Sequence, residues 1–261
     1  MRDSWSGGIA YDRFMGRWSA LIAQKFLPWL AIDPSRTWLD VGCGTGSLTK
    51  LILETCRPEK IISIDSSSDF ISYAQRSITH PAVHFKVGLA QSLDVNSHTM
   101  DAVVSGLMLN FIPQPEAALS EMLRVTKPGG KIGIFLWDYA HGMQMLRYFW
   151  DAAAALDVNA HEVDEGHKFP LCREGQLDAL MRAAGLKQVE ETPIVIKTVF
   201  QDFNDYWQPF LGGVGPAPGY SMGLNPEDRQ RLTDQLRKML PVGEDGSISL
   251  TARAWAVKGT A

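Results

Sequence analysis

The chain has 261 residues, of which 45% are hydrophobic and 21% charged, a composition typical of a packed globular protein rather than a disordered one. The formal net charge is −4 and no run of five or more Lys or Arg occurs, which argues against a nucleic-acid partner. The three cysteines form no CxxC pair or disulfide framework, and the six histidines lack metal-ligand spacing. There is no apolar signal core near Met1 and no uninterrupted apolar run of about 18 residues. We therefore expect a cytoplasmic protein without a membrane partner or a metal.

The first half of the chain alternates between helix and strand patterns. Residues 12–30 are predicted to form an amphipathic helix limited by Pro28, because Phe14, Trp18, Ile22 and Phe26 recur at helical spacing. Short apolar runs then predict five strands, at residues 37–41, 61–64, 83–87, 101–104 and 131–137. The segments between them predict helices at residues 47–56, 69–77 and 115–125.

The second half shows a weaker alternation. Residues 139–184 are predicted to be helical with a loop around 167–170, and residues 200–240 to be helical on both sides of a Gly/Pro-rich loop, Gly212 to Pro226. Two further strands are predicted, at residues 186–199 and 247–257.

Strands that alternate with helices require crossover connections and a mainly parallel sheet covered on both faces, so the fold class is predicted to be doubly wound α/β. We expect a single domain over residues 1–261. Its predicted parts are an N-terminal helical lid (1–35), a cofactor-binding half (36–138) and helical cap segments (139–184 and 200–240).

Residues 40–46 read Asp-Val-Gly-Cys-Gly-Thr-Gly and connect the first predicted strand to the next helix. Glycines permit a sharp turn there and leave bare backbone that a ligand can approach. Asp65 ends the second predicted strand, 19 residues after Gly46, where a carboxylate can accept hydrogen bonds from both hydroxyls of a ribose. The alternatives without a ligand are a purely structural turn at the glycines and a helix N-cap at Asp65.

A nicotinamide dinucleotide would suit the same strand, turn and acid. However, Ser47 stands where the dinucleotide fingerprint has its third glycine. A carboxylate at Asp40 would also lie close to a pyrophosphate, whereas it would suit a ligand with a positive amino group.

Four segments in order resemble the class I S-adenosylmethionine-dependent methyltransferases. They are residues 40–46, Asp65, residues 88–93 (Gly-Leu-Ala-Gln-Ser-Leu) and residues 127–130 (Lys-Pro-Gly-Gly). The chain is most similar to the small-molecule methyltransferases related to those of quinone biosynthesis, although Leu89 replaces the commoner acidic residue. The resemblance implies a Rossmann-like sheet of seven strands, the last antiparallel, and transfer of a methyl group to a small-molecule acceptor.

The resemblance also implies that S-adenosylmethionine is the cofactor. The contacts expected from the sheet half are Asp40, Gly42, Cys43, Gly44 and Gly46 for the amino-acid portion, Asp65 and Ser66 for the ribose, Ala90 and Gln91 for the adenine, and Ser105 and Leu107 along the wall. Tyr11 and Arg17 are expected to reach the cofactor or the acceptor from the N-terminal helix.

The acceptor is less well defined by the sequence. Most aromatic residues lie outside residues 40–130, and a core for the cap helices accounts for most of them. Trp18, Trp137 and Trp207 flank the expected mouth, which would suit an apolar or aromatic acceptor. Asp138 and His141 follow the fifth strand and are candidate general bases, with a structural role as the alternative. The other function classes that remain open are a nicotinamide-dependent oxidoreductase and a non-catalytic binding protein of methyltransferase fold.

Overall fold

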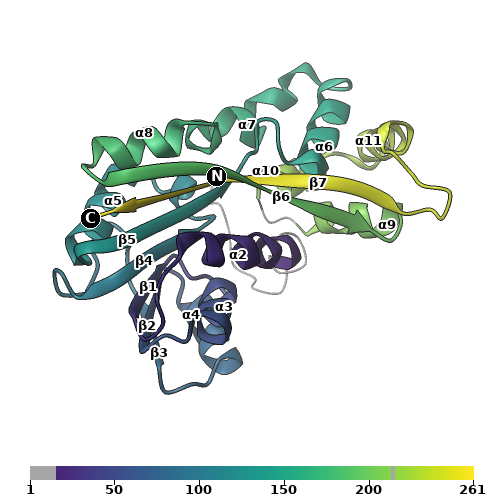
Figure 1. The fold of residues 1–261 in the computed structure, drawn as a ribbon. Coiled ribbons are helices and arrows are strands. Elements are labelled where there is room, and N and C mark those ends of the chain that lie inside the picture. Colours follow the sequence, from purple (N-terminus) through teal and green to yellow (C-terminus); the bar gives the residue numbers. More distant parts are fainter. Residues whose placement is uncertain (1–15, 213–214) are drawn as a thin grey trace.

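The computed structural model describes residues 16–212 and 215–261 and contains one seven-stranded sheet with helices on both of its faces (Figure 1). Along the sheet the strand order is β3-β2-β1-β4-β5-β7-β6. Strands β1 to β5 pair in parallel, and β7 pairs antiparallel with both β5 and β6. The predicted doubly wound α/β fold with an antiparallel last strand is confirmed. The strands are β1 (Thr37–Val41), β2 (Lys60–Asp65), β3 (Val83–Val87), β4 (Met100–Gly106), β5 (Thr126–Trp137), β6 (Lys187–Phe200) and β7 (Ile248–Thr260).

Helices cover the sheet from opposite sides, so that α8 lies above β6 and β7 and α2 below them in the view of Figure 1. The main helices are α2 (Arg17–Leu30), α3 (Ser47–Cys56), α4 (Ser68–Ser77), α5 (Pro115–Val125), α6 (Gln144–Ala154), α8 (Gln176–Ala183), α9 (Phe203–Trp207), α10 (Pro216–Gly223) and α11 (Pro226–Met239). The short helix α7 (Glu165–Lys168) and several 3-10 turns complete the cap. Within the described residues no helix is long and apolar enough to cross a membrane.

The core forms where the apolar stripe of α2 meets the sheet. Trp18, Ile22, Phe26 and Leu30 are all buried and recur every four residues, which places them on one face of the helix. The ring of Phe26 packs against Phe135 of β5 with the ring centroids 4.8 Å apart. The first helix therefore belongs to the same core as the sheet.

Helix α2 ends at Leu30 as predicted, with Pro28 inside its last turn and Ala31 in a left-handed conformation. The structure differs from the predicted elements in two places. Strand β5 begins at Thr126, five residues early, because Thr126 pairs with Met100 and the turn residues 127–130 bulge out before Lys131 pairs with Ala102. The predicted loops around 167–170 and from Gly212 to Pro226 contain short helices, among them α7 and α10.

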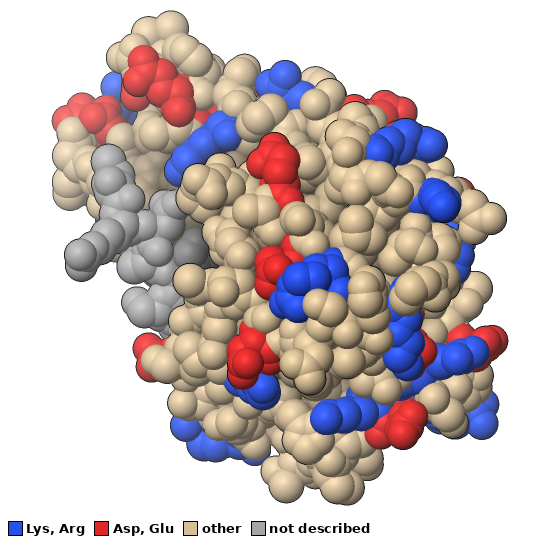
Figure 2. All heavy atoms as spheres, turned by 90° about the vertical axis from the view of Figure 1, so that its left-hand side faces the viewer, with Lys and Arg blue, Asp and Glu red and all other residues tan. Residues whose placement is uncertain are grey.

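The face in Figure 2 carries Lys and Arg side chains interspersed with Asp and Glu, and no continuous basic surface forms on it. Charged side chains of the described residues also form ion pairs, such as Lys127 with Asp101 at 2.8 Å and Arg124 with Glu121 at 2.6 Å. Exposed pairs of this kind contribute little to stability.

Candidate functional site

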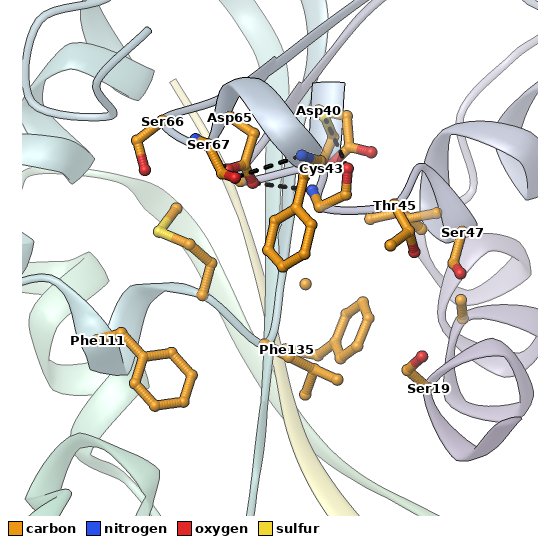
Figure 3. A pocket seen from close by; sticks show the side chains of 18 of the residues that line it. Ser19, Asp40, Cys43, Thr45, Ser47, Asp65, Ser66, Ser67, Phe111 and Phe135 are labelled. Atoms are coloured by element: carbon orange, nitrogen blue, oxygen red, sulfur yellow. Dashed lines mark hydrogen bonds between the residues drawn. The ribbon is translucent and has the colours of Figure 1, made fainter. Parts of the chain in front are cut away.

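A pocket of about 280 Å³ opens at the carboxyl ends of the parallel strands. The strand order reverses between β1 and β4, and ligands of doubly wound sheets bind in the crevice at such a point. The pocket is lined by residues from the ends of β1, β2 and β4, by the start of α3, and by one face of α2. Figure 3 shows two ends of different chemistry, with Asp40 and Asp65 at one end and Phe111 and Phe135 at the other.

The glycine-rich turn is fixed to the neighbouring strand. The backbone N–H groups of Gly42 and Cys43 both donate to the carbonyl of Ile64, at 2.7 and 3.0 Å. Gly42 and Gly44 have φ angles of 76° and 54°, in the left-handed region that favours glycine. A Cβ added at Gly44 would meet no atom within 4 Å, so the turn presents open backbone to the pocket.

Asp65 links the turn to the start of α4. Its Oδ2 accepts a hydrogen bond from the N–H of Gly44 at 2.9 Å, and its Oδ1 accepts one from the N–H of Ser67, also at 2.9 Å. Burial raises the pKa of Asp65, and these backbone hydrogen bonds oppose the rise. The carboxylate retains lone pairs for a ligand because each oxygen can accept more than one hydrogen bond.

Asp40 is fully buried at the end of β1. Its Oδ2 accepts a hydrogen bond from Thr49 Oγ1 at 2.7 Å, and that hydroxyl lies 2.8 Å from Ser63 Oγ. The other oxygen, Oδ1, is buried without a hydrogen-bond partner among the described residues. Burial raises the pKa of Asp40 to about 7. A buried carboxylate oxygen without a partner is unfavourable by itself and suits a pocket that receives a cation.

The opposite end of the pocket is apolar. It is formed by Leu107, Met108, Phe111, Ile112 and Phe135, together with Ala23 and Ser19 of α2. Met108 reaches across the crevice to the turn, since a Cβ added at Gly42 would lie 2.4 Å from Met108 Cγ. Gly42 is therefore favoured for two reasons, its positive φ angle and the lack of space for a side chain next to Met108.

Seven of the sequence-predicted cofactor residues line this pocket, namely Asp40, Gly42, Cys43, Gly44, Asp65, Ser66 and Leu107. Five others lie outside its lining, namely Arg17, Gly46, Ala90, Gln91 and Ser105. Tyr11 lies outside the described residues. Ala90 and Gln91 follow β3, which is the neighbour of β2, and the N–H of Gly88 donates to the carbonyl of Asp65 at 2.9 Å. They therefore lie one strand away from the pocket.

Gly46 and Arg17 have places that differ from the predicted ones. Gly46 has a φ of 90°, and a Cβ there would lie 2.8 Å from Ile78 Cδ1, so this glycine permits close packing between the turn and the end of α4. The guanidinium of Arg17 pairs with Asp205 at 3.0 Å and lies over the Trp18 ring, which directs it toward α9 rather than into the pocket.

The two candidate bases do not reach the pocket. Asp138 is 1% exposed, and its Oδ2 accepts hydrogen bonds from Nε and Nη2 of Arg253, at 2.8 and 2.5 Å. Its Oδ1 accepts the N–H of His141 at 2.9 Å, and the side chain of His141 is exposed. The ion pair between Asp138 and Arg253 therefore joins the end of β5 to β7. Neither Asp138 nor His141 lines the pocket.

The rings that line the pocket are also not the expected ones. Trp18, Trp137 and Trp207 are buried in the core, whereas Phe70, Phe111 and Phe135 face the pocket. These phenylalanines, and also Met108 and Ser19, are not among the residues predicted for the site from the sequence. Phe111 could have been predicted from its position, because it follows the fourth strand at the edge of the sheet where the ligand crevice opens.

Comparisons with known proteins agree with this geometry. Residues 39–134 match the family model described as a methyltransferase domain. The 2-phytyl-1,4-naphtoquinone methyltransferase of Thermosynechococcus vestitus is 30% identical over 120 residues, which are 45% of this chain and 52% of that protein. The malonyl-[acyl-carrier protein] O-methyltransferase of Serratia marcescens is 29% identical over 148 residues, 54% of this chain and 56% of that protein. The chain thus spans about half the length of the curated relatives it matches.

Solved structures share the fold over nearly the whole chain. A putative methyltransferase from an antibiotic biosynthesis pathway of Anabaena variabilis superimposes with a TM-score of 0.65 at 16% identity, covering 92% of this chain and 97% of that one. A phosphoethanolamine N-methyltransferase 2 of Haemonchus contortus, in complex with S-adenosyl-L-methionine, gives a TM-score of 0.62 at 15% identity, covering 98% of this chain and 56% of that one. The predicted resemblance to methyltransferases is confirmed, and the match to the methyltransferase-domain model extends over residues 39–134.

Proposed function

We propose that this chain is an enzyme that transfers a methyl group from S-adenosylmethionine to a small, neutral and apolar acceptor. The observation that carries the proposal is one pocket at the strand ends that joins an open glycine turn and two carboxylates to an apolar, aromatic end. The quinone methyltransferase and the carrier-protein methyltransferase described above are similar to 45% and 54% of this chain, and they support a small organic acceptor.

The residues at the polar end fit the cofactor. Asp65 would hold the ribose hydroxyls, and Asp40 with the turn from Gly42 to Gly44 would hold the amino-acid portion. The unpartnered Oδ1 of Asp40 and the open space at Gly44 support this assignment. Of the described side chains that line the pocket, the charged ones are both carboxylates, which suits a cofactor that carries a sulfonium and an ammonium group. Ala90 and Gln91 remain the proposed adenine contacts, one strand away from Asp65.

When bound, the cofactor supplies an electrophilic methyl group. The chain's contribution at the apolar end is orientation and exclusion of water, because the described residues there offer no carboxylate, imidazole or amine in reach. Asp138 is engaged by Arg253 and is not carried forward as a base. An acceptor that is neutral and already nucleophilic, such as an electron-rich aromatic carbon, suits this wall.

Residues 1–35 are proposed to close the pocket, with residues 36–138 binding the cofactor and residues 139–184 and 200–240 forming the cap. Ser19 and Ala23 support the closing role because they bring α2 to the pocket wall. Hydrogen exchange tests it, since the amides of α2 should gain protection when S-adenosylhomocysteine is added. If the exchange rates of these amides are the same with and without S-adenosylhomocysteine, α2 only packs against the sheet.

Calorimetry with S-adenosylhomocysteine and with NAD tests the cofactor class. We expect the first ligand to bind and the second to give no heat. Tritium transfer from labelled cofactor to a panel of neutral phenols and hydroquinones then tests turnover. Tight binding of NAD alone would favour an oxidoreductase, and cofactor binding without transfer to any panel member would favour a non-catalytic binding protein.

A further inference from the structure

The two ends of the pocket select ligands of different charge. The carboxylates of Asp40 and Asp65 stand at the cofactor end, and the apolar end carries no Lys, Arg or His among the described residues. An anionic acceptor would meet two carboxylates in the same small cavity and no described cation that could offset the repulsion. The wall therefore fits a neutral acceptor with a flat apolar face.

Phe111 differs from the other rings of this wall in how it is held. Phe135 is 2% exposed within β5, and its ring is fixed against Phe26. Phe111 is half-buried and belongs to a 3-10 turn of three residues (Leu109–Phe111) that follows β4. In Figure 3 its ring borders the pocket on the side away from Ser19 and the start of α3. It is thus a ring at the pocket edge that the sheet does not fix.

A ring of the cap supports Phe111 from outside the pocket. Phe169, in the segment between α7 and the 3-10 turn Pro170–Cys172, is buried and contacts Phe111 edge to face, with centroids 5.1 Å apart and an interplanar angle of 80°. Tyr139, just after β5, contacts Phe169 in turn, at 5.9 Å. Phe169 therefore lies between a ring of the pocket wall and a ring anchored next to the sheet.

None of the described residues in 139–184 lines the pocket itself. The aromatic contact is therefore a route by which this cap segment can affect the acceptor, because it restricts the orientations open to the Phe111 ring. Edge-to-face pairs add a favourable term beyond burial, and that term depends on orientation.

We infer that Phe111 is the side chain that selects the acceptor, by stacking on a neutral aromatic ring, and that Phe169 is a positioning residue that holds Phe111 in place. The inference rests on the proposed function, because it takes the apolar end of the pocket as the acceptor site.

The test uses the full chain saturated with S-adenosylhomocysteine and two probes, neutral 2-naphthol and anionic 2-naphthoate, in isothermal titration. We expect 2-naphthol to bind at least about tenfold more tightly than 2-naphthoate, since the carboxylates repel the anion. Phe111→Ala should weaken 2-naphthol binding about tenfold, and Phe111→Leu, which keeps apolar volume, should weaken it less. The affinity for S-adenosylhomocysteine should not change in either variant.

A double-mutant cycle tests Phe169. Phe169→Ala should weaken 2-naphthol binding several-fold when Phe111 is present and have no effect in the Phe111→Ala background, because its action passes through that ring. Phe169→Leu should restore part of the loss. Leu180→Ala, a truncation in α8 of the same cap, is the matched control and should lower the melting temperature without changing the probe affinity.

Three results would overturn the inference: no 2-naphthol binding to the loaded protein, equal affinity for the two probes, or unchanged 2-naphthol affinity in Phe111→Ala. A Phe169→Ala effect that persists without Phe111 would overturn the positioning role. Failure of the wild-type protein to bind S-adenosylhomocysteine is a different result, and it would refute the proposed function instead.

Discussion

The pH dependence of cofactor binding should report the ionisation of Asp40. Burial raises the pKa of this carboxyl to about 7, and its Oδ1 has no described hydrogen-bond partner. A ligand with positive groups binds more tightly to the ionised form. Affinity should therefore fall about tenfold for each pH unit below 7 and level off above 7. Asp40→Asn should weaken binding above pH 7 and give a flatter profile below it.

The same group should affect stability in the opposite direction. Because the folded-state pKa of about 7 exceeds the reference value of 3.8, the folded protein retains a proton that the unfolded chain releases between these values. The free energy of unfolding should thus decrease as the pH rises from about 4 to about 7, by about 4 kcal/mol for roughly three pKa units. Asp40→Asn should remove this decrease.

Glu165 provides the matched control. Burial raises its pKa to about 7 as well, but it lies in the cap, where Trp150 Nε1 donates to one of its oxygens, and it does not line the pocket. Glu165→Gln should change the stability profile in the same pH window and leave the binding profile as it is.

Titration calorimetry with S-adenosylhomocysteine in two buffers of different ionisation enthalpy measures both affinity and proton release. We expect release to approach about one proton below pH 7 in the wild type and to decrease in Asp40→Asn. If the two proteins show the same slope and the same proton release, Asp40 does not titrate with the ligand and the reasoning is refuted.

Three further predictions concern the turn and the core. Asp65→Asn should weaken cofactor binding at least about tenfold in calorimetry. The amide has no negative charge, and its NH2 group would face one of the two backbone N–H groups that donate hydrogen bonds to the carboxylate. Unchanged affinity would show that Asp65 does not contact the cofactor. In denaturant titrations Gly46→Ala should lose about 2–3 kcal/mol, since its Cβ meets Ile78 and its φ is positive, whereas Gly44→Ala should lose only about 1 kcal/mol in open space; equal losses would contradict the packing role of Gly46. Arg253→Met should destabilise the protein by about 3–5 kcal/mol by leaving Asp138 buried and unpaired, with Asp138→Asn/Arg253→Met recovering part of the loss; a single variant as stable as wild type would show that the pair is dispensable.

The parallel half of the sheet could be predicted because its signals are local. Each predicted strand there is a short apolar run, and Asp40 and Asp65 mark the ends of β1 and β2 as the structure has them, followed by turn residues. The helix α10 could not be predicted in this way. Its sequence begins Pro-Ala-Pro-Gly, which by local preference indicates a loop, and its burial at Ala217 and Ser221 depends on tertiary packing.

The polar end of the site was accessible to sequence analysis, whereas the apolar end was not. Asp40, Gly44 and Asp65 belong to a short motif whose spacing reflects contact with a ligand. Phe111 and Phe135 are indistinguishable in sequence from residues of the core, because both environments prefer apolar side chains. Only the fold shows which of them border a cavity.

Asp138 shows a second limit of local information. Its position after the fifth strand predicted a place among catalytic groups, but its partner Arg253 lies 115 residues further along the chain. The sheet brings the two together only because β7 pairs with β5, and no short-range pattern contains that pairing.

The insertion of β7 between β5 and β6 has a consequence for how the chain folds. Within the described residues β6 pairs with no strand other than β7, which follows it only after α9, α10 and α11. During synthesis β1 to β5 can assemble first. The edge of β5 and the whole of β6 then stay unpaired until β7, which is distant from β5 in the sequence, has been made. Closing this long loop is slow, and unpaired edges are prone to aggregate. We therefore expect the last folding step to be the docking of β7, with the cap ordered only once that strand is in place.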